Sequence, residues 1–376
     1  HRSRRCSCAR GGRTASPPAF WRSSSMELHL PACWPQFHCI ASACTHNCCV
    51  GWEIDIDEKT AQRYRQLDGP LGEKLRQKID WEAPDGPFFQ LEGERCPFLT
   101  GENLCEIQQA LGHEGLCEIC SQHPRFQNTF GKLKEMGLGL CCEEAARLIF
   151  TGPRSSVLLT QTVDEPEEEL ENALLLEPLL QLRETMFHLL EQTDRPFSQR
   201  LMGLLSLAGE AQDWLSALPD ELTGKPVLPD FSPAAETAPV PILPVLDSVV
   251  ETFSQMEPVD DEWEQSLARV EDWLSALTEE EWQETGKGLD AFGQEVYLRL
   301  AEYLLYRYLL QSLEDRDLLT RVQMVVISCV MVRMMELAEQ RENFTLDDCI
   351  RLTGLWSRQL EYSLENLALL ADACFL

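Results

Sequence analysis

Cysteine is concentrated at one end of this chain, and this constrains the fold more than any other feature. Thirteen of the sixteen cysteines lie in the first 142 residues, and the remaining 234 residues contain only Cys329, Cys349 and Cys374. The densest group is the run CIASACTHNCC at 39–49. Thiols at such short spacings either form disulfides or hold a soft metal or an iron–sulfur cluster.

The composition favours a metal centre over disulfides. A secreted disulfide scaffold is usually a short chain without room for a core, whereas 376 residues with 44% apolar composition can build two cores. Residues 1–25 carry six arginines but no apolar segment of the kind found in a signal peptide. We therefore expect a reducing, cytoplasmic compartment and a metal centre, with disulfides as the alternative.

The sequence predicts a mainly α-helical protein in two parts. Residues 26–150 are expected to form a small cysteine-rich α+β metal-binding domain, and residues 151–376 an α-helical domain. A linker at 219–244 with seven prolines interrupts the second part. Residues 1–25 are basic and aperiodic, so we expect a disordered extension outside the native reading frame, with a transit peptide as the alternative.

Hydrophobic periodicity places the expected elements along the chain. In the first part, the alternation of Trp52, Ile54 and Ile56 with acidic residues predicts a short strand, and a hairpin is expected at 126–140 about Gly131. Short helices are expected at 57–67, 71–79, 106–111, 115–122 and 143–148. In the second part, helix is expected from 165 onward, with one run at 184–207 and long helices at 245–254, 262–277, 293–312, 318–340 and 346–373.

The chain is strongly acidic. Without the six arginines of residues 1–25, 26 basic residues face 62 acidic ones, a net charge of −36. Such a chain should repel nucleic acid and anionic membranes and attract lysine-presenting surfaces, although solubility alone would also explain the charge. No apolar run is expected to span a membrane, since the longest, 324–335, is broken by Ser328, Cys329 and Arg333.

The cysteine spacing favours an iron–sulfur cluster over zinc. A [4Fe–4S] cluster needs four ligands, three of which often come from one tight loop. Cys39, Cys44 and Cys48 supply such a loop, and the candidates for the remaining ligand are Cys49, Cys96, Cys105, Cys120 and Cys142. Structural zinc prefers C-x2-C pairs, and only Cys117 and Cys120 have that spacing, so zinc is the alternative metal. Cys329, Cys349 and Cys374 are expected to pack as small hydrophobes.

An ordered series of motifs resembles one family. It begins with FHCIASACTHNCCVGWEIDID at 37–57 and continues with CPFL at 96–99, LCEIQ at 104–108, LG at 111–112, Cys120 with PR at 124–125, and CEEAARL at 142–148, with EYL at 302–304 as a fainter match. In this order the motifs resemble the bacterial flagellin lysine-N-methylases, which are related to small cysteine-rich zinc- or iron-chelating proteins. The resemblance covers residues 31–150 strongly and the rest by helical character.

The resemblance implies S-adenosylmethionine-dependent transfer of methyl groups to lysine ε-amines of flagellin, with an iron–sulfur cluster required. The positions that match the family's cysteines, and are implied as metal ligands, are Cys39, Cys44, Cys48, Cys49, Cys96, Cys105, Cys120 and Cys142. Cys33, Cys117 and Cys141 do not match and are not expected to be ligands. Catalytic and donor-binding residues stay unassigned, because the chain has no strand–GxGxxG–helix unit.

Charged residues near the motif cysteines have open roles. Glu143 or Glu144 could accept the proton that the target lysine must lose, or simply favour the start of a helix. Arg125 and Arg147 could offset cluster charge or hold a donor carboxylate, or be surface residues. His38, His46, His113 and His123 are metal ligands in principle and are expected to be polar neighbours.

Two functions therefore compete. The first is cluster-dependent methylation, with the helical part docking flagellin. The second is a non-enzymatic protein that chelates or senses zinc or iron. We favour the first, because a chelating module needs only one small domain and the long helical part calls for a substrate or partner.

Overall fold

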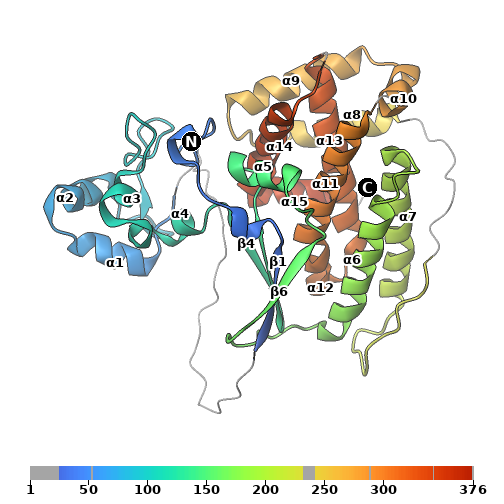
Figure 1. Ribbon diagram of the computed structural model, residues 1–376, viewed down its shortest axis with the longest axis horizontal. Coiled ribbons are helices and arrows are strands. Elements are labelled where there is room, and N and C mark those ends of the chain that lie inside the picture. Colours follow the sequence, from blue (N-terminus) through green and yellow to red (C-terminus); the bar gives the residue numbers. More distant parts are fainter. Residues whose placement is uncertain (1–24, 52–53, 232–241, 288, 342, 375–376) are drawn as a thin grey trace.

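The protein is mainly helical, with a small α+β region near its N-terminus, as the sequence predicts. The computed structural model describes residues 25–51, 54–231, 242–287, 289–341 and 343–374 (Figure 1). The predictions for residues 1–24, for Trp52 and for the centre of the proline-rich linker lie outside these residues. The metal-binding character of the N-terminal region stays a prediction.

Four short helices and a two-stranded sheet form a small module, drawn at the left of Figure 1. The helices are α1 (Glu58–Gln66), α2 (Gly69–Lys78), α3 (Glu106–Leu111) and α4 (Glu118–Gln122), and the strands are β2 (Ile79–Asp80) and β3 (Phe88–Phe89). Asp57 caps α1 by accepting a hydrogen bond from Thr60 N, and its second oxygen accepts one from Glu118 N at the start of α4. Asp57 therefore fixes the two helices relative to each other.

The module has its own hydrophobic core, which includes Ile54, Tyr64, Phe89 and Phe98. The strand expected at 52–56 is wrong in the described part: Asp55 forms only an isolated bridge with Phe88, although Ile54 and Ile56 are buried as the alternation predicts. The segment is too short to build a ladder, and its apolar side chains are buried against the helices instead.

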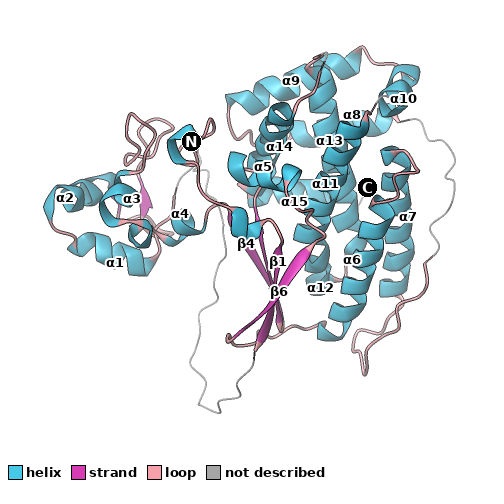
Figure 2. Ribbon diagram, viewed as in Figure 1, coloured by secondary structure: helices cyan, strands magenta, loops and turns pink. Residues whose placement is uncertain are grey.

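A mixed four-stranded sheet lies against the helical body (Figure 2). Its strands are β1 (Met26–Pro31), β4 (Arg125–Phe130), β5 (Leu133–Leu138) and β6 (Leu158–Val163), in the order β4-β5-β1-β6. The hairpin β4–β5 turns at Gly131, whose φ of 61° suits glycine, so the predicted hairpin is confirmed. Strands β1 and β6 were not predicted. They pair with distant segments, β1 parallel to β5 and antiparallel to β6.

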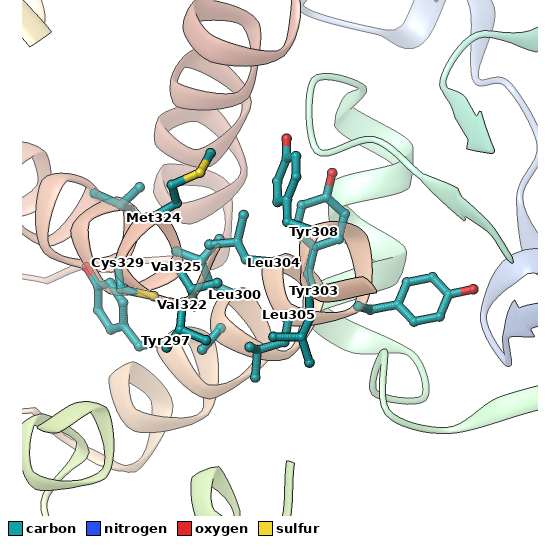
Figure 3. Close-up of a cluster of buried hydrophobic side chains, with 14 of the residues drawn as sticks. Tyr297, Leu300, Tyr303, Leu304, Leu305, Tyr308, Val322, Met324, Val325 and Cys329 are labelled. Atoms are coloured by element: carbon teal, nitrogen blue, oxygen red, sulfur yellow. The ribbon is translucent and has the colours of Figure 1, made fainter. Parts of the chain in front are cut away.

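The helical body is a bundle built around two buried helices. Its helices are α5 (Glu143–Thr151), α6 (Leu176–Leu190), α7 (Phe197–Ser216), α8 (Leu243–Ser254), α9 (Asp261–Ser275), α10 (Glu279–Lys287), α11 (Ala291–Tyr308), α12 (Ser312–Asp315), α13 (Leu318–Ala338), α14 (Leu346–Glu361) and α15 (Leu364–Ala373). Figure 3 shows apolar side chains of α11 and α13 packed together, Leu300 and Leu304 with Val322 and Val325. Cys329, Cys349 and Cys374 are buried in this core, as expected.

Three helix predictions are wrong in their boundaries. Helix does not begin at 165, because a 3-10 turn at Ala173–Leu175 precedes α6. The run at 184–207 is two helices, since Pro196 ends the break between α6 and α7. The run at 346–373 is also two helices, because Ser363 caps a new helix. The apolar periodicity continues through these breaks and therefore hides them.

Helix α13 is long and apolar enough to cross a membrane, which corrects the expectation that no run in the chain has this length. In the described structure, 61% of its apolar window is buried inside the helical body. A core helix meets the same criteria of length and hydropathy, so the finding carries no conclusion about a membrane.

Candidate metal centre

The loop between the module and the helical body brings the first motif cysteines to the start of α5. Thr45 donates two hydrogen bonds to Glu143 Oε2, from its backbone N and its Oγ1, both at 2.7 Å. His46 Nε2 lies 3.6 Å from Glu262 Oε2 on α9. The loop that carries Cys44 and Cys48 is therefore attached to the helical body at two points.

Cys44, Cys48 and Cys142 form the first group of thiols. Cys142 is the N-cap residue of α5. Burial raises the pKa of its thiol to about 12, and the nearby Cys44 and Cys48 add to the shift. Burial likewise raises the pKa of Cys44 to about 12, with Glu143 and Cys48 as nearby negative groups. The three cysteines therefore come together at the start of α5, and burial keeps the thiols of Cys44 and Cys142 protonated.

The second group lies in the module and contains Cys49, Cys96, Cys105 and Cys120, with Cys117. Cys96 N donates a 2.8 Å hydrogen bond to Cys49 O, and an isolated bridge joins Leu99 to Cys105. Cys105 and Cys117 are the N-cap residues of α3 and α4. Burial raises the pKa of Cys96 to about 12, and Cys105, Cys117 and Cys48 raise it further. Four segments of the module thus contribute thiols to one region.

Cys48 and Cys49 connect the two groups. A hydrogen bond from Cys49 lowers the pKa of Cys48, and the same bond with burial raises the pKa of Cys49. Cys48 also raises the pKa of Cys105 and Cys142, one from each group. A similar bond from Cys120 lowers the pKa of Cys117. The adjacent pair at 48–49 therefore lies between the module and the helical body.

The chemistry of this donor set fits an iron–sulfur cluster or zinc, since its donors are soft thiols. Within the described residues, no three His, Cys, Asp or Glu side chains are arranged closely enough to hold a metal ion. The described cysteines are free thiols. The motif thiols of this region fall in two groups, with Cys44, Cys48 and Cys142 at the helical body and Cys49, Cys96, Cys105 and Cys120 in the module.

The other cysteines lie apart from this region or at its edge. Cys39 is exposed, and its Sγ accepts a hydrogen bond from Ala41 N. Cys33 belongs to the core of the helical body. Cys141 is half-buried near Glu361 and Tyr362, and burial raises the pKa of its thiol to about 12. Cys117 does not match the family motif but lies beside Cys120, which does. Proximity to a motif cysteine is therefore not enough to identify a cysteine as a metal ligand.

Glu143 and Glu144 occupy the first turn of α5, where acidic side chains favour the start of a helix. Glu144 accepts two hydrogen bonds from Arg147, at 2.5 and 2.7 Å. Arg147 is therefore paired within its own helix. Arg125 lies over the rings of Trp34 and Phe37, with its guanidinium carbon 5.5 and 5.1 Å from the ring centres. Arg147 is thus paired with a carboxylate, and Arg125 is packed on aromatic rings.

The histidines near the cysteines differ in their surroundings. His38 Nδ1 lies 3.0 Å from Gln36 O, and His113 is exposed. Burial lowers the pKa of His123 to about 4, and Arg125 adds to the shift. Burial and Arg358 lower the pKa of His46 as well. His46 and His123 are thus neutral at physiological pH, the form that could bind a metal.

A buried polar cluster around Glu361 supports the turn that carries Cys142. Tyr308 Oη donates to Glu361 Oε1 at 2.9 Å, and Arg307 Nε lies 3.2 Å from the same oxygen. Tyr303 Oη accepts hydrogen bonds from Arg307 Nη1 at 2.8 Å and from Leu140 N at 3.4 Å. Burial raises the pKa of Tyr303, so it stays protonated. The cluster therefore joins α11 and α14 to the backbone just before Cys141–Cys142.

Sequence reasoning missed this cluster. It gave no role to Arg307, Tyr308 or Glu361, and Tyr303, which is 2% exposed, appeared only within a fainter motif match. The available signal was the EYL motif at 302–304, which places Tyr303 on the buried face of a helix. Next to Glu361, Tyr362 packs against the core of the module, so the end of α14 contacts both parts of the protein.

A family model matches most of the helical part of the chain, and alignments with individual relatives cover about a third of the chain. The family described as the FliB lysine N-methylase C-terminal domain matches residues 183–374. The lysine-N-methylase of Salmonella typhimurium is 28% identical over 139 residues, 35% of each chain. The flagellar biosynthetic protein FliU of Salmonella muenchen is 29% identical over 137 residues, 34% of this chain and 79% of that protein. No solved structure matches the chain.

The alignment thus covers about a third of the length of the Salmonella lysine-N-methylases. The family match is more extensive in this chain, because it runs from α6 to α15 and includes Tyr303, Arg307 and Glu361. The match that assigns the family lies in the helical part, and on this match the chain belongs to the family of the FliB lysine N-methylase C-terminal domain.

Proposed function

We propose that this protein is a protein-lysine methyltransferase that methylates lysine ε-amines of flagellin. The observation that carries the proposal is the family match over residues 183–374. Two further findings support it: relatives named lysine-N-methylase, and a relative named as a flagellar biosynthetic protein. We further propose S-adenosylmethionine as donor, and a cytoplasmic location in which the thiols stay reduced.

The proposed reaction requires a neutral lysine. The lone pair of the ε-nitrogen attacks the methyl carbon of the donor sulfonium, the carbon–sulfur bond breaks, and its electron pair stays on the departing thioether. The proton of the lysine ammonium must first pass to a base or to water. Burial opposes ionisation of Glu143, but the hydrogen bonds from Thr45 outweigh it and lower the pKa. A weakly basic carboxylate suits positioning of the 44–48 loop better than proton removal.

The cluster is proposed to be held by four of the thiols that the resemblance implies, which are Cys39, Cys44, Cys48, Cys49, Cys96, Cys105, Cys120 and Cys142. When bound, an iron–sulfur cluster would either hold the methyl donor or only shape the domain. The chain's own contribution is to hold the thiols in place: the Thr45–Glu143 hydrogen bond fixes the loop that leads to Cys48 and Cys49, and the Leu140–Tyr303 hydrogen bond fixes the backbone before Cys142. Zinc is the alternative metal.

A second function, non-enzymatic chelation or sensing of zinc or iron, is favoured by one observation. The cysteine-rich module has a core of its own, distinct from that of the helical body. Such a module could bind a metal without the helices. It leaves the family-defining helical part without a role, so methylation is the preferred proposal.

The test is co-expression with flagellin, followed by mass spectrometry of flagellin lysines. Methylated lysines that depend on this protein are expected. Cys48→Ser should abolish the methylation and the bound iron together, whereas Cys374→Ala, a buried cysteine of the helical core, should preserve both. Unmodified flagellin with protein that contains bound metal would instead support chelation.

A further inference from the structure

Strand β6 is an open edge of the four-stranded sheet. It pairs with β1 along its whole length, from Met26 with Val163 to Pro31 with Leu158. Within the described residues, no strand pairs with its other side. In an antiparallel pair, every second residue turns its N–H and C=O away from the partner. The outer side of β6 therefore carries a row of backbone donors and acceptors.

This edge lacks the features that usually protect a strand from pairing. Proteins block edges with charged residues, proline, bulges or a covering segment. The strand sequence LLTQTV contains no charged residue and no proline. Leu159 is 38% exposed, Val157 just before the strand is 49% exposed, and Thr160, Gln161 and Thr162 are exposed as well. The edge is thus accessible to another extended segment.

An acidic run follows the strand directly. Its members are Asp164, Glu165, Glu167, Glu168, Glu169 and Glu171. Glu168 N donates a 3.1 Å hydrogen bond to Gly131 O, which fastens the run beside the turn of the β4–β5 hairpin. Among the described residues, Glu165 is the one member with an ion pair, to Lys134 at 2.6 Å. The other carboxylates are exposed to solvent and free to meet basic groups of a partner.

We propose that the outer edge of β6 binds an extended, lysine-bearing segment of the protein substrate as an added strand. Backbone hydrogen bonds would supply affinity, as in other cases of strand addition, and the acidic run would speed encounter with a basic segment. The inference rests on the proposed function for the choice of substrate. The edge is a docking surface, and the docked segment is distinct from the lysine that is methylated.

Charge argues for a basic partner over a second copy of this chain. The described acidic run would meet an equally acidic molecule in a β6–β6 dimer, and the net charge of the chain, −30, makes self-association unfavourable. A lysine-bearing strand has the opposite charge. The same run would therefore stabilise it while repelling a copy.

The test measures binding of a labelled synthetic peptide of alternating threonine and lysine by fluorescence anisotropy. The full chain is used without donor or added flagellin, so the result does not depend on methylation. A second peptide of the same sequence is N-methylated on alternate backbone nitrogens, which keeps its charge but removes strand pairing. We expect the first peptide to bind and the second to bind at least about tenfold more weakly.

Variants assign the binding to this edge. The triple variant Glu167→Lys, Glu168→Lys, Glu169→Lys should weaken binding about tenfold. A matched control reverses three exposed acids of α8 and α9, Asp247→Lys, Glu251→Lys and Glu271→Lys, and should bind as the unmodified chain does. The edge variant Thr160→Lys, Thr162→Lys should also bind weakly, because lysines on an edge strand oppose pairing with a basic segment.

Four results would overturn the proposal: no binding of the first peptide, equal binding of the two peptides, equal loss of binding in the control triple variant, or a dimer of the unmodified chain that dissociates in the edge variant. The last would assign the edge to a second copy. If the peptide binds as expected but flagellin is never methylated, the docking edge stands and the proposed function fails. If flagellin is methylated but the peptide does not bind, the proposed function stands and the docking edge fails.

Discussion

Arg183 on α6 donates two hydrogen bonds to Glu135 on β5, at 2.9 and 2.6 Å, in the buried interface between sheet and helices. Both side chains are almost fully excluded from solvent. Burial opposes ionisation of Glu135, but Arg183 and His29 outweigh it and lower the pKa. The sheet that leads to α5 and Cys142 is thus anchored to the bundle by a buried ion pair.

Removing one partner of this pair should destabilise the protein more than removing both. Arg183→Met removes the bidentate partner of the buried Glu135 carboxylate, which keeps His29 Nδ1 at 3.7 Å, and is expected to cost about 3–5 kcal/mol. In the double variant Arg183→Met, Glu135→Leu neither charge remains, so a large part of the loss should be regained. Urea unfolding followed by circular dichroism measures both. Equal stability of the single and the double variant would show that the two residues are not coupled.

Glu302 should make stability depend on pH. This fully buried carboxyl lies 3.6 Å from Arg154, and burial raises its pKa from 4.5 to about 7. Since the folded pKa lies above the unfolded one, the folded state binds the proton more tightly, and stability falls as pH rises from about 4.5 to about 7. Glu302→Gln should remove this fall and stabilise the protein at pH above 7 by up to roughly 3 kcal/mol.

The control for Glu302 lies on the same helix. Glu295 is half-exposed and pairs with Arg299 across one helical turn, so Glu295→Gln should leave the pH dependence unchanged. Melting temperatures across the pH range compare the two variants with the unmodified chain. A pH profile that Glu302→Gln does not alter would place the titrating group elsewhere.

Tyr303 and Tyr308 should differ in their effect on the thiol region. Tyr303→Phe leaves Leu140 N and Arg307 Nη1 without their acceptor, next to the turn that carries Cys142. We expect a loss of about 1–3 kcal/mol in stability and a lower iron content after anaerobic purification. Tyr308→Phe removes only a donor to Glu361 and should retain more iron. A higher iron content in the Tyr303→Phe protein than in the Tyr308→Phe protein would contradict this positioning role.

The acidic character of the chain, which should attract lysine-presenting surfaces, predicts a salt effect. The runs to be tested are the acidic residues at 165–171 and Glu279–Glu281 at the start of α10. Exposed charges speed encounter, and this effect is screened over about 8 Å at physiological ionic strength. Methylation at limiting flagellin should therefore slow as salt is raised, and reversing charges at 165–171 or 279–281 should weaken the dependence. Initial rates over a salt series provide the measurement. A rate that does not change with salt would leave the charge a role in solubility alone.

Local patterns in the sequence predicted the elements that depend on local residues. Asp57 caps α1, Gly131 turns the β4–β5 hairpin, and the acidic pair at 143–144 begins α5, each as expected. Strands β1 and β6 escaped prediction because their pairing joins segments more than a hundred residues apart, and LLTQTV has no clean alternation of burial. Breaks such as the one before Phe197 also escaped, because leucines recur at helical spacing on both sides.

In the thiol region, too, the sequence predicted what depends on local spacing and missed what depends on distant contacts. Spacing identified the loop at 39–48, and the family resemblance added distant cysteines that the structure places in two neighbouring groups. Spacing already paired Cys117 with Cys120, but it could not reveal that Glu361 and Tyr303 support the turn before Cys142 from helices far along the chain. Tertiary contacts between remote segments leave no mark on the local pattern.

The most direct measurement is a methylation assay with purified components. Anaerobically prepared protein is incubated with flagellin and S-adenosylmethionine that carries a deuterated methyl group, and the flagellin lysines are analysed by mass spectrometry. We predict deuterated methyl groups on lysine side chains, and none with the Cys48→Ser protein. Flagellin without label, although the protein is folded and contains iron, would contradict the proposed activity.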